Sequence, residues 1–335
     1  ILVGTPSGVS LAPEGGAHQS ITTPSIGIEQ PGCVSYEPAF AIDTEWCLLA
    51  SLARLGRPDG SSAYLRLSTR PVSQKLAGMP ADPAARERRR RQVVSGAYPL
   101  RRADKPAVTI AVMGAVVPEA LAAAERLESA GVPADVVCVT SPGLLFRALR
   151  ARQGVQGAGQ PPGEPWILEQ AFPVARATPL VTVLDGHPHT LSFLATVNRV
   201  PHAALGVAQF GQSGSIEDLY RYNGIDTDSI IRAALDLAPL RPHCVSLRQP
   251  ASNVRSQHYR QRQGSTAMRL SARNQIPARV TGINSGEAIA NVELDAGGVR
   301  LVASITVEAV EQLGLAEGSQ VTAVIKASDV ILATS

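Results

Sequence analysis

The fold of the last part of the chain is decided by the stretch 278-ARVTGINSGEAIANVELDAGGVRLVAS-304. Apolar and polar residues alternate in 278–283, 290–294 and 299–304, as in strands with one buried face. Gly282, Gly286 and the Gly297-Gly298 pair mark bends or turns. A helix is predicted at 307–313, with Thr306 as its N-cap, and 321–332 closes the domain. Mostly short strands in about 65 residues predict a small all-β barrel of OB type.

Upstream of this domain, between about residues 106 and 237, apolar strands alternate with helices. Strands are predicted at 108–112, 135–139, 180–184 and 204–208, and helices at 119–129, 144–152, 191–197 and 215–222. Strands without a polar face indicate a mostly parallel sheet that is covered on both faces, which is an α/β fold. Residues 1–75 run strand, loop, helix and strand, with the helix at 39–55 and the second strand at 63–68.

These changes of pattern predict five segments along the chain. They are an N-terminal remnant at 1–80, a basic linker at 81–105, the α/β domain at 106–237, a second linker at 238–267 and the β domain at 268–335. The second linker has five Arg and no acidic residue, and Met268 follows it directly. We therefore hypothesise that two neighbouring genes are read through as one chain. Because the chain opens with Ile1, we expect a fragment whose natural N-terminus is missing.

Composition argues against several classes of function. The net charge of +3 is small, and the Arg-rich run 86–91 is expected to be a solvated helix rather than a nucleic-acid surface. No apolar run approaches the roughly 18 residues of a membrane span. The four cysteines are widely spaced and form no Cys-x-x-Cys pair, which fits a cytoplasmic location and predicts no metal site. Cys47 and Cys138 lie in apolar runs and are expected in the core.

Two short segments at the ends of the β domain carry a pattern of hydrogen-bond donors. They are Ser271-Ala272-Arg273-Asn274-Gln275 and Ile325-Lys326-Ala327-Ser328-Asp329-Val330. With the glycine-containing hairpin and the strand end at 304–306, they resemble the molbindin family, also called Mop or TOBE domains. The resemblance covers 268–335 and implies binding of molybdate or tungstate, for molybdenum storage, homeostasis or transport.

The chemistry of these segments suits that ligand. Molybdate is a tetrahedral dianion with four acceptor oxygens, so it needs converging N–H and O–H donors. Side-chain donors come from Ser271, Lys326 and Ser328, and backbone N–H groups come from Ala272, Arg273, Asn274 and Ala327. In the family one subunit supplies the first segment and another supplies the second, which implies a homo-oligomer. Each residue also has a structural reading: a solvated Lys326, serines that end strands, or an interface salt bridge from Arg273.

Four other motifs lie in the first 237 residues. They are Glu14-Gly15-Gly16-Ala17-His18-Gln19, Ser35-Tyr36-Glu37-Pro38-Ala39-Phe40, Asp185-Gly186-His187-Pro188-His189 and Phe210-Gly211-Gln212-Ser213-Gly214-Ser215. In that order they resemble the transketolase-like decarboxylating component of the homodimeric pyruvate dehydrogenase complex. The resemblance implies a C-terminal α/β domain of the transketolase type at 106–237 and the end of a pyrimidine-binding domain at 1–80.

The alternative function is therefore a fragment of a thiamine diphosphate-dependent 2-oxo acid dehydrogenase. Thiamine diphosphate and magnesium would be bound only in an intact parent enzyme, because no Gly-Asp-Gly…Asn-Asn segment is present. In that enzyme His18 would donate a proton or orient the substrate, and Glu14 is a weaker candidate. His187 and His189 follow an apolar strand and could serve a site at its end, while Asp185 could equally cap a helix. We expect the chain alone to be inactive.

Overall fold

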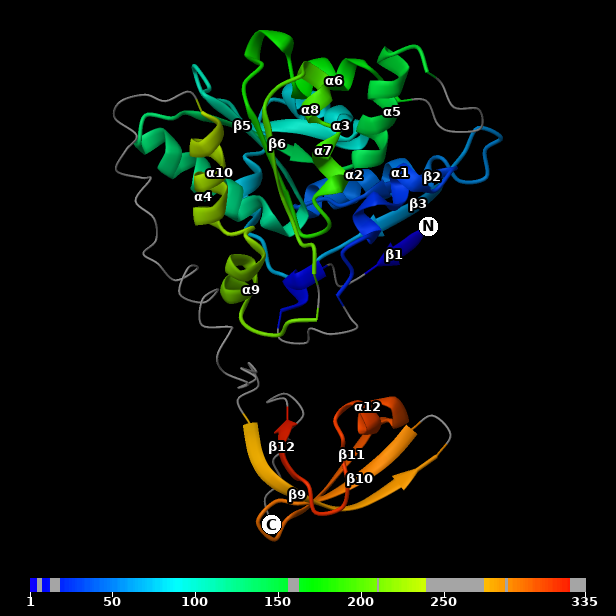
Figure 1. Ribbon diagram of the computed structural model, residues 1–335. Coiled ribbons are helices and arrows are strands. Elements are labelled where there is room, and N and C mark those ends of the chain that lie inside the picture. The colour runs from blue at the N-terminus through cyan, green and yellow to red at the C-terminus, as the bar shows by residue number, and fades with distance from the viewer. Residues whose placement is uncertain are drawn as a thin grey trace. The chain divides into compact units, whose positions relative to one another are not determined.

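The structure is a computed structural model that describes residues 1–4, 8–12, 19–155, 163–209, 211–238, 274–286 and 289–325. The chain divides into two compact units, Ile1–Arg262 and Gln263–Ser335, and each is described by itself. Figure 1 shows the first unit in blue to yellow and the second in orange to red. Among the described residues, no helix has the length and the apolar character needed to cross a bilayer.

A five-stranded sheet forms the centre of the first unit, in the order β4-β6-β5-β7-β8. Its strands are β4 (Ala97–Arg101), β5 (Val108–Met113), β6 (Ala134–Val139), β7 (Leu180–Leu184) and β8 (His202–Leu205). All pairs are parallel except β4 with β6. Every residue of β5, β6 and β7 is buried, as expected for a parallel sheet between two helical layers. The predicted α/β fold with a mostly parallel sheet is confirmed.

Helices cover both faces of this sheet (Figure 1). One hydrophobic cluster joins the sheet to α4 (Val117–Ser129) and α10 (Thr227–Leu237), and the other joins it to α5 (Pro142–Arg152) and α6 (Trp166–Ala171). Two short helices, α7 (His189–Ser192) and α8 (Ala195–Asn198), replace the single helix predicted at 191–197. Helix α9 (Ile216–Asn223) matches its prediction within a residue. Cys47 and Cys138 are buried free thiols, as predicted.

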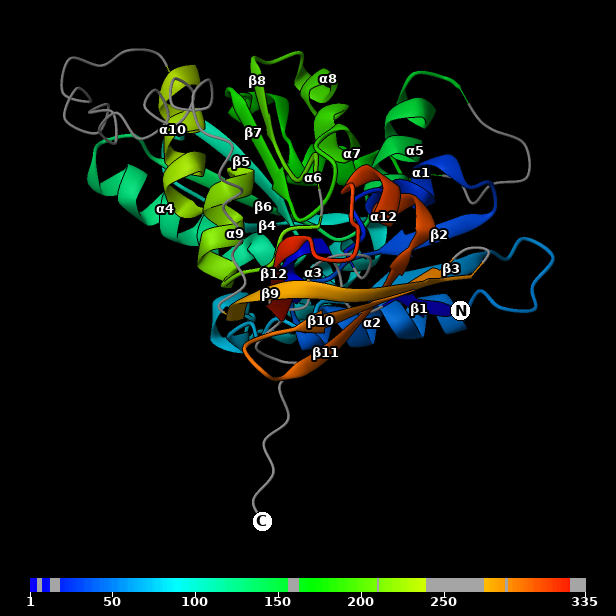
Figure 2. The same ribbon diagram turned by 60° about the horizontal axis from the view of Figure 1, so that its bottom comes forward.

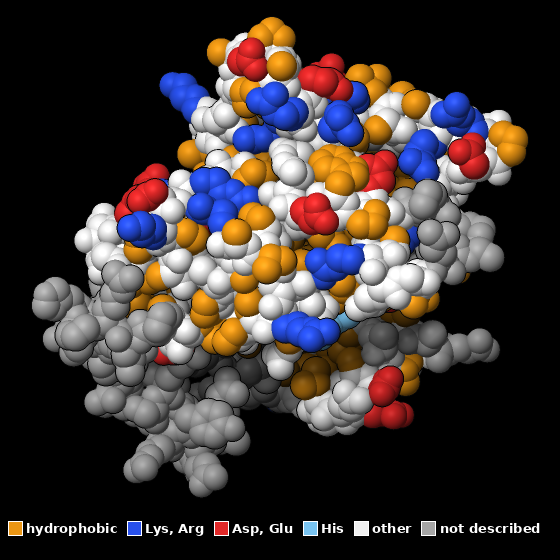
Figure 3. All heavy atoms as spheres, turned by 90° about the horizontal axis from the view of Figure 1, so that it is seen from above, with side chains coloured by type: hydrophobic (Ala, Val, Ile, Leu, Met, Phe, Trp, Pro, Cys, Tyr) orange, Lys and Arg blue, Asp and Glu red, His pale blue; other side chains and the backbone are white. Residues whose placement is uncertain are grey.

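The segment 81–105, predicted to be a linker, contributes to the sheet. Asp82 caps helix α3 (Pro83–Ser95) by accepting a hydrogen bond from the backbone N–H of Ala85. Strand β4 then pairs with β6 at the sheet edge. The Arg-rich run on α3 is used locally: Arg90 pairs with Glu87, and the Arg89 guanidinium lies 4.2 Å from the centre of the Tyr98 ring. On the face shown in Figure 3, Lys and Arg side chains are scattered among acidic and apolar ones.

A second, three-stranded parallel sheet comes from the N-terminal part, in the order β1-β3-β2. It consists of β1 (Leu2–Gly4), β2 (Cys33–Tyr36) and β3 (Ser62–Arg66), with helices α1 (Ile26–Glu29) and α2 (Ala41–Leu52). Phe40, Trp46 and Cys47 belong to the same hydrophobic cluster as β5 and α4. The segments 1–80 and 106–237 therefore share one core.

The second unit is a curled antiparallel sheet in the order β11-β10-β9-β12 (Figure 2). Its elements are β9 (Asn274–Ser285), β10 (Ile289–Asp295), β11 (Arg300–Thr306), α12 (Val307–Gln312) and β12 (Gln320–Ile325). Thr306 caps α12 by accepting from the N–H of Ala309, as predicted. Gly297 and Gly298 both have positive φ at the hairpin between β10 and β11, where a side chain would be strained. This small β fold is consistent with the predicted OB-like architecture.

Candidate functional site

The first and last strands of the second unit in sequence, β9 and β12, are hydrogen-bonded neighbours. The pairing is antiparallel and runs from Asn274 opposite Ile325 to Arg279 opposite Gln320. Asn274 is the first residue of β9, and Ile325 is the last residue of β12. Paired strands lie about 4.8 Å apart. The segment that ends in Arg273 and the segment that begins with Lys326 are therefore attached to neighbouring backbone positions of one sheet.

For the predicted molybdate-binding residues, the described part of the chain gives only the pairing of Asn274 with Ile325. For Asn274 the structure describes the backbone. The other predicted residues lie outside the described part of the chain: Ser271, Ala272, Arg273, Lys326, Ala327 and Ser328. Their contribution to a site therefore stays a prediction. What the register adds is that Asn274 and Ile325, the residues to which the two segments are joined in sequence, pair within a single copy of the chain.

The predicted catalytic residues Glu14 and His18 also lie outside the described residues. The residue that follows them, Gln19, is held by two hydrogen bonds. Its Nε2 donates to the carbonyl of Gln212 at 2.8 Å, and its Oε1 accepts from the N–H of Gly211 at 2.7 Å. The first and last of the four N-terminal motifs are thus adjacent, although nearly 200 residues separate them in sequence.

A buried polar network joins the carboxyl ends of strands from both sheets of the first unit. Arg66, the last residue of β3, is 2% exposed and donates from Nη1 to Glu37 Oε1 at 2.7 Å. Its Nη2 donates to the carbonyls of Ser20 and Asp185 at 2.7 and 2.9 Å, and its Nε donates to Thr23 Oγ1. A single guanidinium therefore fastens four segments that are remote in sequence.

Asp185, which follows β7, holds the second part of the network. Its carboxylate accepts from the N–H groups of Val9 and Ser10 at 2.8 and 2.7 Å, and also from the Ser10 hydroxyl. The Ser10 hydroxyl in turn contacts the Tyr220 hydroxyl of α9 at 2.5 Å. Asp185 is thus a cap, but for the 3-10 helix Gly8–Leu11 and not for the helix that follows it in sequence.

Two glycines allow this close packing. A Cβ on Gly8 would lie 2.0 Å from Asp185 Oδ1, and a Cβ on Gly114 would lie 2.4 Å from Glu37 Oε1, and both residues have positive φ. Any other residue at either position would displace a buried carboxylate.

Burial shapes the electrostatics of the two carboxyl groups. Desolvation raises the pKa of Glu37, and Arg66 opposes that rise by its charge and its hydrogen bond. Desolvation also raises the pKa of Asp185, against the charge of Arg66 and the hydrogen bonds from Ser10 and Val9. Glu37 Oε2 has no hydrogen-bond partner among the described residues. Arg66 therefore favours the charged, carboxylate forms of Glu37 and Asp185 against the effect of burial.

Sequence reasoning missed Arg66, Ser10 and Tyr220 as members of this network. Arg66 alone carried a local signal, because it is a charged residue that directly follows the apolar Leu65 in a predicted strand. Within the described part of the chain, no group of three or more His, Cys, Asp or Glu side chains could hold a metal ion. The hydrogen bonds of the network join segments of the first unit to one another, so the network stabilises the packing of that unit.

The fold defines a chain of two parts, an α/β unit with a mostly parallel sheet followed by a small antiparallel β domain. Family models agree: the TOBE domain matches residues 270–332, and the transketolase-like TK C-terminal domain matches residues 96–226. Molybdenum-pterin-binding protein 1 of Clostridium pasteurianum is 44% identical over 66 residues, which are 19% of this chain and 97% of that protein. Through its last 66 or so residues, the chain belongs to the TOBE-domain family.

The first unit has longer relatives. The pyruvate dehydrogenase E1 component of Mycolicibacterium smegmatis is 27% identical over 243 residues, covering 70% of this chain and 25% of that protein. A transketolase structure from Campylobacter jejuni has a TM-score of 0.50 at 18% identity, over 70% of this chain and 31% of that one. This likeness shows the fold of the first unit. The chain spans about a quarter to a third of these proteins.

The buried network generates one prediction. Replacing Arg66 by Met keeps the length of the side chain but leaves the buried carboxyl of Glu37 and the carbonyl of Asp185 without their donor. We expect the free energy of unfolding of the first unit to fall by about 3–5 kcal/mol. Urea denaturation, monitored by tryptophan fluorescence, measures this change in the free energy of unfolding, because Trp46 and Trp166 both lie in this unit.

The matched control is Arg57→Met. Arg57 is exposed, and its Nη1 makes one long hydrogen bond of 3.5 Å to the carbonyl of Ala53. Its loss should change the free energy of unfolding by no more than about 0.5 kcal/mol. Equal effects of the two substitutions would show that the Arg66 network does not hold the unit together.

Proposed function

We propose that the C-terminal unit binds molybdate at the end of the sheet where β9 begins and β12 ends. The observation that carries the proposal is the register of Asn274 opposite Ile325, which joins the two donor-rich segments to adjacent strands. Membership in the TOBE-domain family, with relatives named for binding molybdenum-pterin, supports it. A dianion with four acceptor oxygens suits hydroxyl, ammonium and backbone N–H donors at 271–274 and 326–328.

We further propose that the site is completed by a second copy of the chain. The core of the unit is small, with Ala278, Val280, Val292 and Leu294 buried at its centre. Large apolar side chains remain exposed around it: Ile289 at 60%, Val299 at 59%, Val302 at 52% and Leu313 at 62%. A domain this small rarely supplies enough buried surface by itself, and exposed apolar side chains favour association.

The proposed role is molybdenum storage, homeostasis or transport, with tungstate as an alternative ligand of the same shape and charge. A cytoplasmic location fits the buried free thiols of Cys33, Cys47 and Cys138. The alternative function is that of a fragment of a thiamine diphosphate-dependent 2-oxo acid dehydrogenase. It is favoured by the similarity of the first unit to a pyruvate dehydrogenase E1 component over 243 residues.

Calorimetric titration of the whole chain with molybdate tests the main proposal. Lys326→Ala and Ser328→Ala should each weaken binding about tenfold or more, because each removes a donor to a charged ligand. Arg300→Ala is the control within the same unit, since Arg300 pairs with Glu293 and lies on β11, the edge strand that is separated from β12 by β10 and β9. Absence of heat with molybdate at every accessible concentration would remove the proposal, and preference for a molybdenum-pterin would redefine the ligand.

Co-expression of two variants tests whether the site is shared between copies. If one copy supplies 271–274 and another supplies 326–328, Ser271→Ala and Lys326→Ala chains assembled together should regain intact sites. In a two-copy assembly, one of the two sites would combine the unchanged segments of both chains. Each variant alone should bind weakly, and the mixed assembly should recover about half of the molybdate capacity. A mixed assembly no better than the single variants would place each site within one copy.

The alternative function makes a separate prediction about catalysis. The purified chain, given thiamine diphosphate, magnesium and pyruvate, should release no carbon dioxide above the level without protein. The intact pyruvate dehydrogenase component of a relative serves as the positive control in the same assay. Turnover by this chain alone would establish an active site that the described residues do not reveal.

A further inference from the structure

The loop that follows β7 carries two histidine side chains that contact each other. The Nδ1 atoms of His187 and His189 lie 2.6 Å apart, and the centres of the two rings lie 4.7 Å apart. The backbone N–H of His189 also donates to His187 Nδ1, at 3.3 Å. Because His187 Nδ1 accepts that bond, it carries a lone pair, and the proton between the two rings belongs to Nδ1 of His189. The contact therefore fixes the tautomer of His189.

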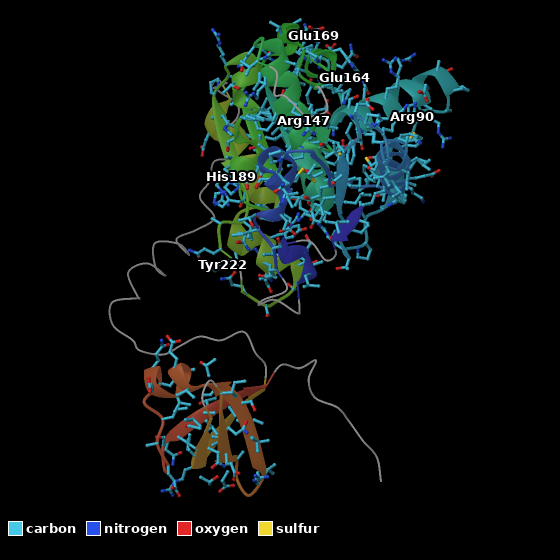
Figure 4. The ribbon with its side chains drawn as sticks, turned by 90° about the vertical axis from the view of Figure 1, so that its right-hand side faces the viewer. Arg90, Arg147, Glu164, Glu169, His189 and Tyr222 are labelled. Carbon is cyan, nitrogen blue, oxygen red and sulfur yellow. The ribbon has the colours of Figure 1, made fainter. Side chains whose placement is uncertain are left out.

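This tautomer leaves Nε2 of an uncharged His189 as an acceptor that faces a carboxylate. His189 Nε2 lies 3.5 Å from Oε1 of Glu29, the last residue of α1. The hydroxyl of Ser25 donates to the same carboxylate oxygen at 2.7 Å and holds it in place. Figure 4 shows His189 at the edge of the first unit. Two acceptors that converge in this way repel each other unless a cation lies between them, either a proton on Nε2 or a metal ion.

The distance between the two acceptors favours the metal ion. A charged N–H···O hydrogen bond to a carboxylate is about 2.7–2.9 Å long, so 3.5 Å is too long for a proton shared between His189 and Glu29. Zinc binds imidazole nitrogen and carboxylate oxygen at about 2.0–2.2 Å in tetrahedral geometry, which places two ligand atoms about 3.4 Å apart. His189 Nε2 and Glu29 Oε1 thus already have the separation of two zinc ligands.

Neighbouring backbone holds the histidine loop in this position. The N–H of His187 donates to the carbonyl of Ile21 at 2.7 Å, and the carbonyl of Gly186 accepts from the N–H of Val207 at 2.8 Å. A Cβ on Gly206 would lie 2.9 Å from the Pro188 nitrogen, so β8 packs closely on the loop. The side chains of His189 and Glu29 are 49% and 65% exposed, so an ion in solution can reach them.

We propose that His189 and Glu29 bind a divalent transition-metal ion such as zinc, with His187 as the residue that orients His189. Imidazole with carboxylate suits zinc, whereas magnesium and calcium prefer oxygen ligands alone. An outer partner on each ligand, His187 on one and Ser25 on the other, is typical of metal sites. Water completes the coordination of the ion.

The bound ion would join two parts of the first unit. Glu29 belongs to the segment 1–80, and His189 belongs to the α/β domain at 106–237. The site adjoins the buried network at Asp185 but uses none of its residues. All its residues lie in the first unit, so it is independent of the proposed molybdate site. A metal ion that binds only the folded unit stabilises the packing of these two segments.

Calorimetric titration of the whole chain with zinc chloride tests the site, together with thermal unfolding monitored by tryptophan fluorescence. We expect saturable zinc binding and a Tm that rises with zinc concentration, and no such response to magnesium chloride. His18, His243, His258 and Cys244 lie outside the described residues, so zinc bound there would form a common background. The measurement is therefore the difference between each variant and the wild type.

His189→Gln and Glu29→Gln should each weaken this binding at least about tenfold and reduce the rise in Tm, because each removes a ligand. Glu45→Gln, at an exposed position of α2, is the matched control and should respond like the wild type.

The role of His187 is tested by two substitutions. His187→Leu removes the acceptor for His189 Nδ1–H and should weaken zinc binding about 10-fold to 100-fold. His187→Asn keeps a side-chain acceptor and should retain most of the affinity. The proposal is overturned if zinc binds no better than magnesium, or if His189→Gln and Glu29→Gln both bind zinc as the wild type does.

Discussion

Asn274 and Ile325 are hydrogen-bonded neighbours, although they are the first and last residues of the second unit's sheet. The whole account of ligand binding depends on this pairing, because it attaches two donor-rich segments to the same end of one sheet. The core that supports the pairing is small and leaves several large apolar side chains exposed. A second copy that covers those side chains would stabilise the pairing and complete the donor set at the same time.

The first unit is organised by a comparable constraint. The Arg66 guanidinium ties the end of β3 to three other segments, and Asp185 ties the end of β7 to the 3-10 helix Gly8–Leu11. Both sheets therefore present their carboxyl ends to one buried network.

Local pattern predicted much of the fold. Strands β5, β6 and β7 were predicted within one residue of their bounds, because short, continuous apolar runs between turn residues are typical of strands buried in a parallel sheet. Strand β4 was missed because the Arg-rich composition before it indicates a linker, and its pairing with β6 is a tertiary effect. The motifs of the TOBE domain are local, so the family could be recognised from sequence. The Arg66 network could not, because its acceptors come from residues as distant as Ser20 and Asp185.

The most direct test of the central claim is the position of the bound metal. A crystal structure of the molybdate-loaded chain, with data collected at the molybdenum absorption edge, locates the ion by its anomalous scattering. The account predicts the anomalous peak beside the start of β9 and the end of β12, within hydrogen-bond reach of 271–274 of one copy and 326–328 of another. A peak elsewhere on the chain, with none at this end of the sheet, would contradict it.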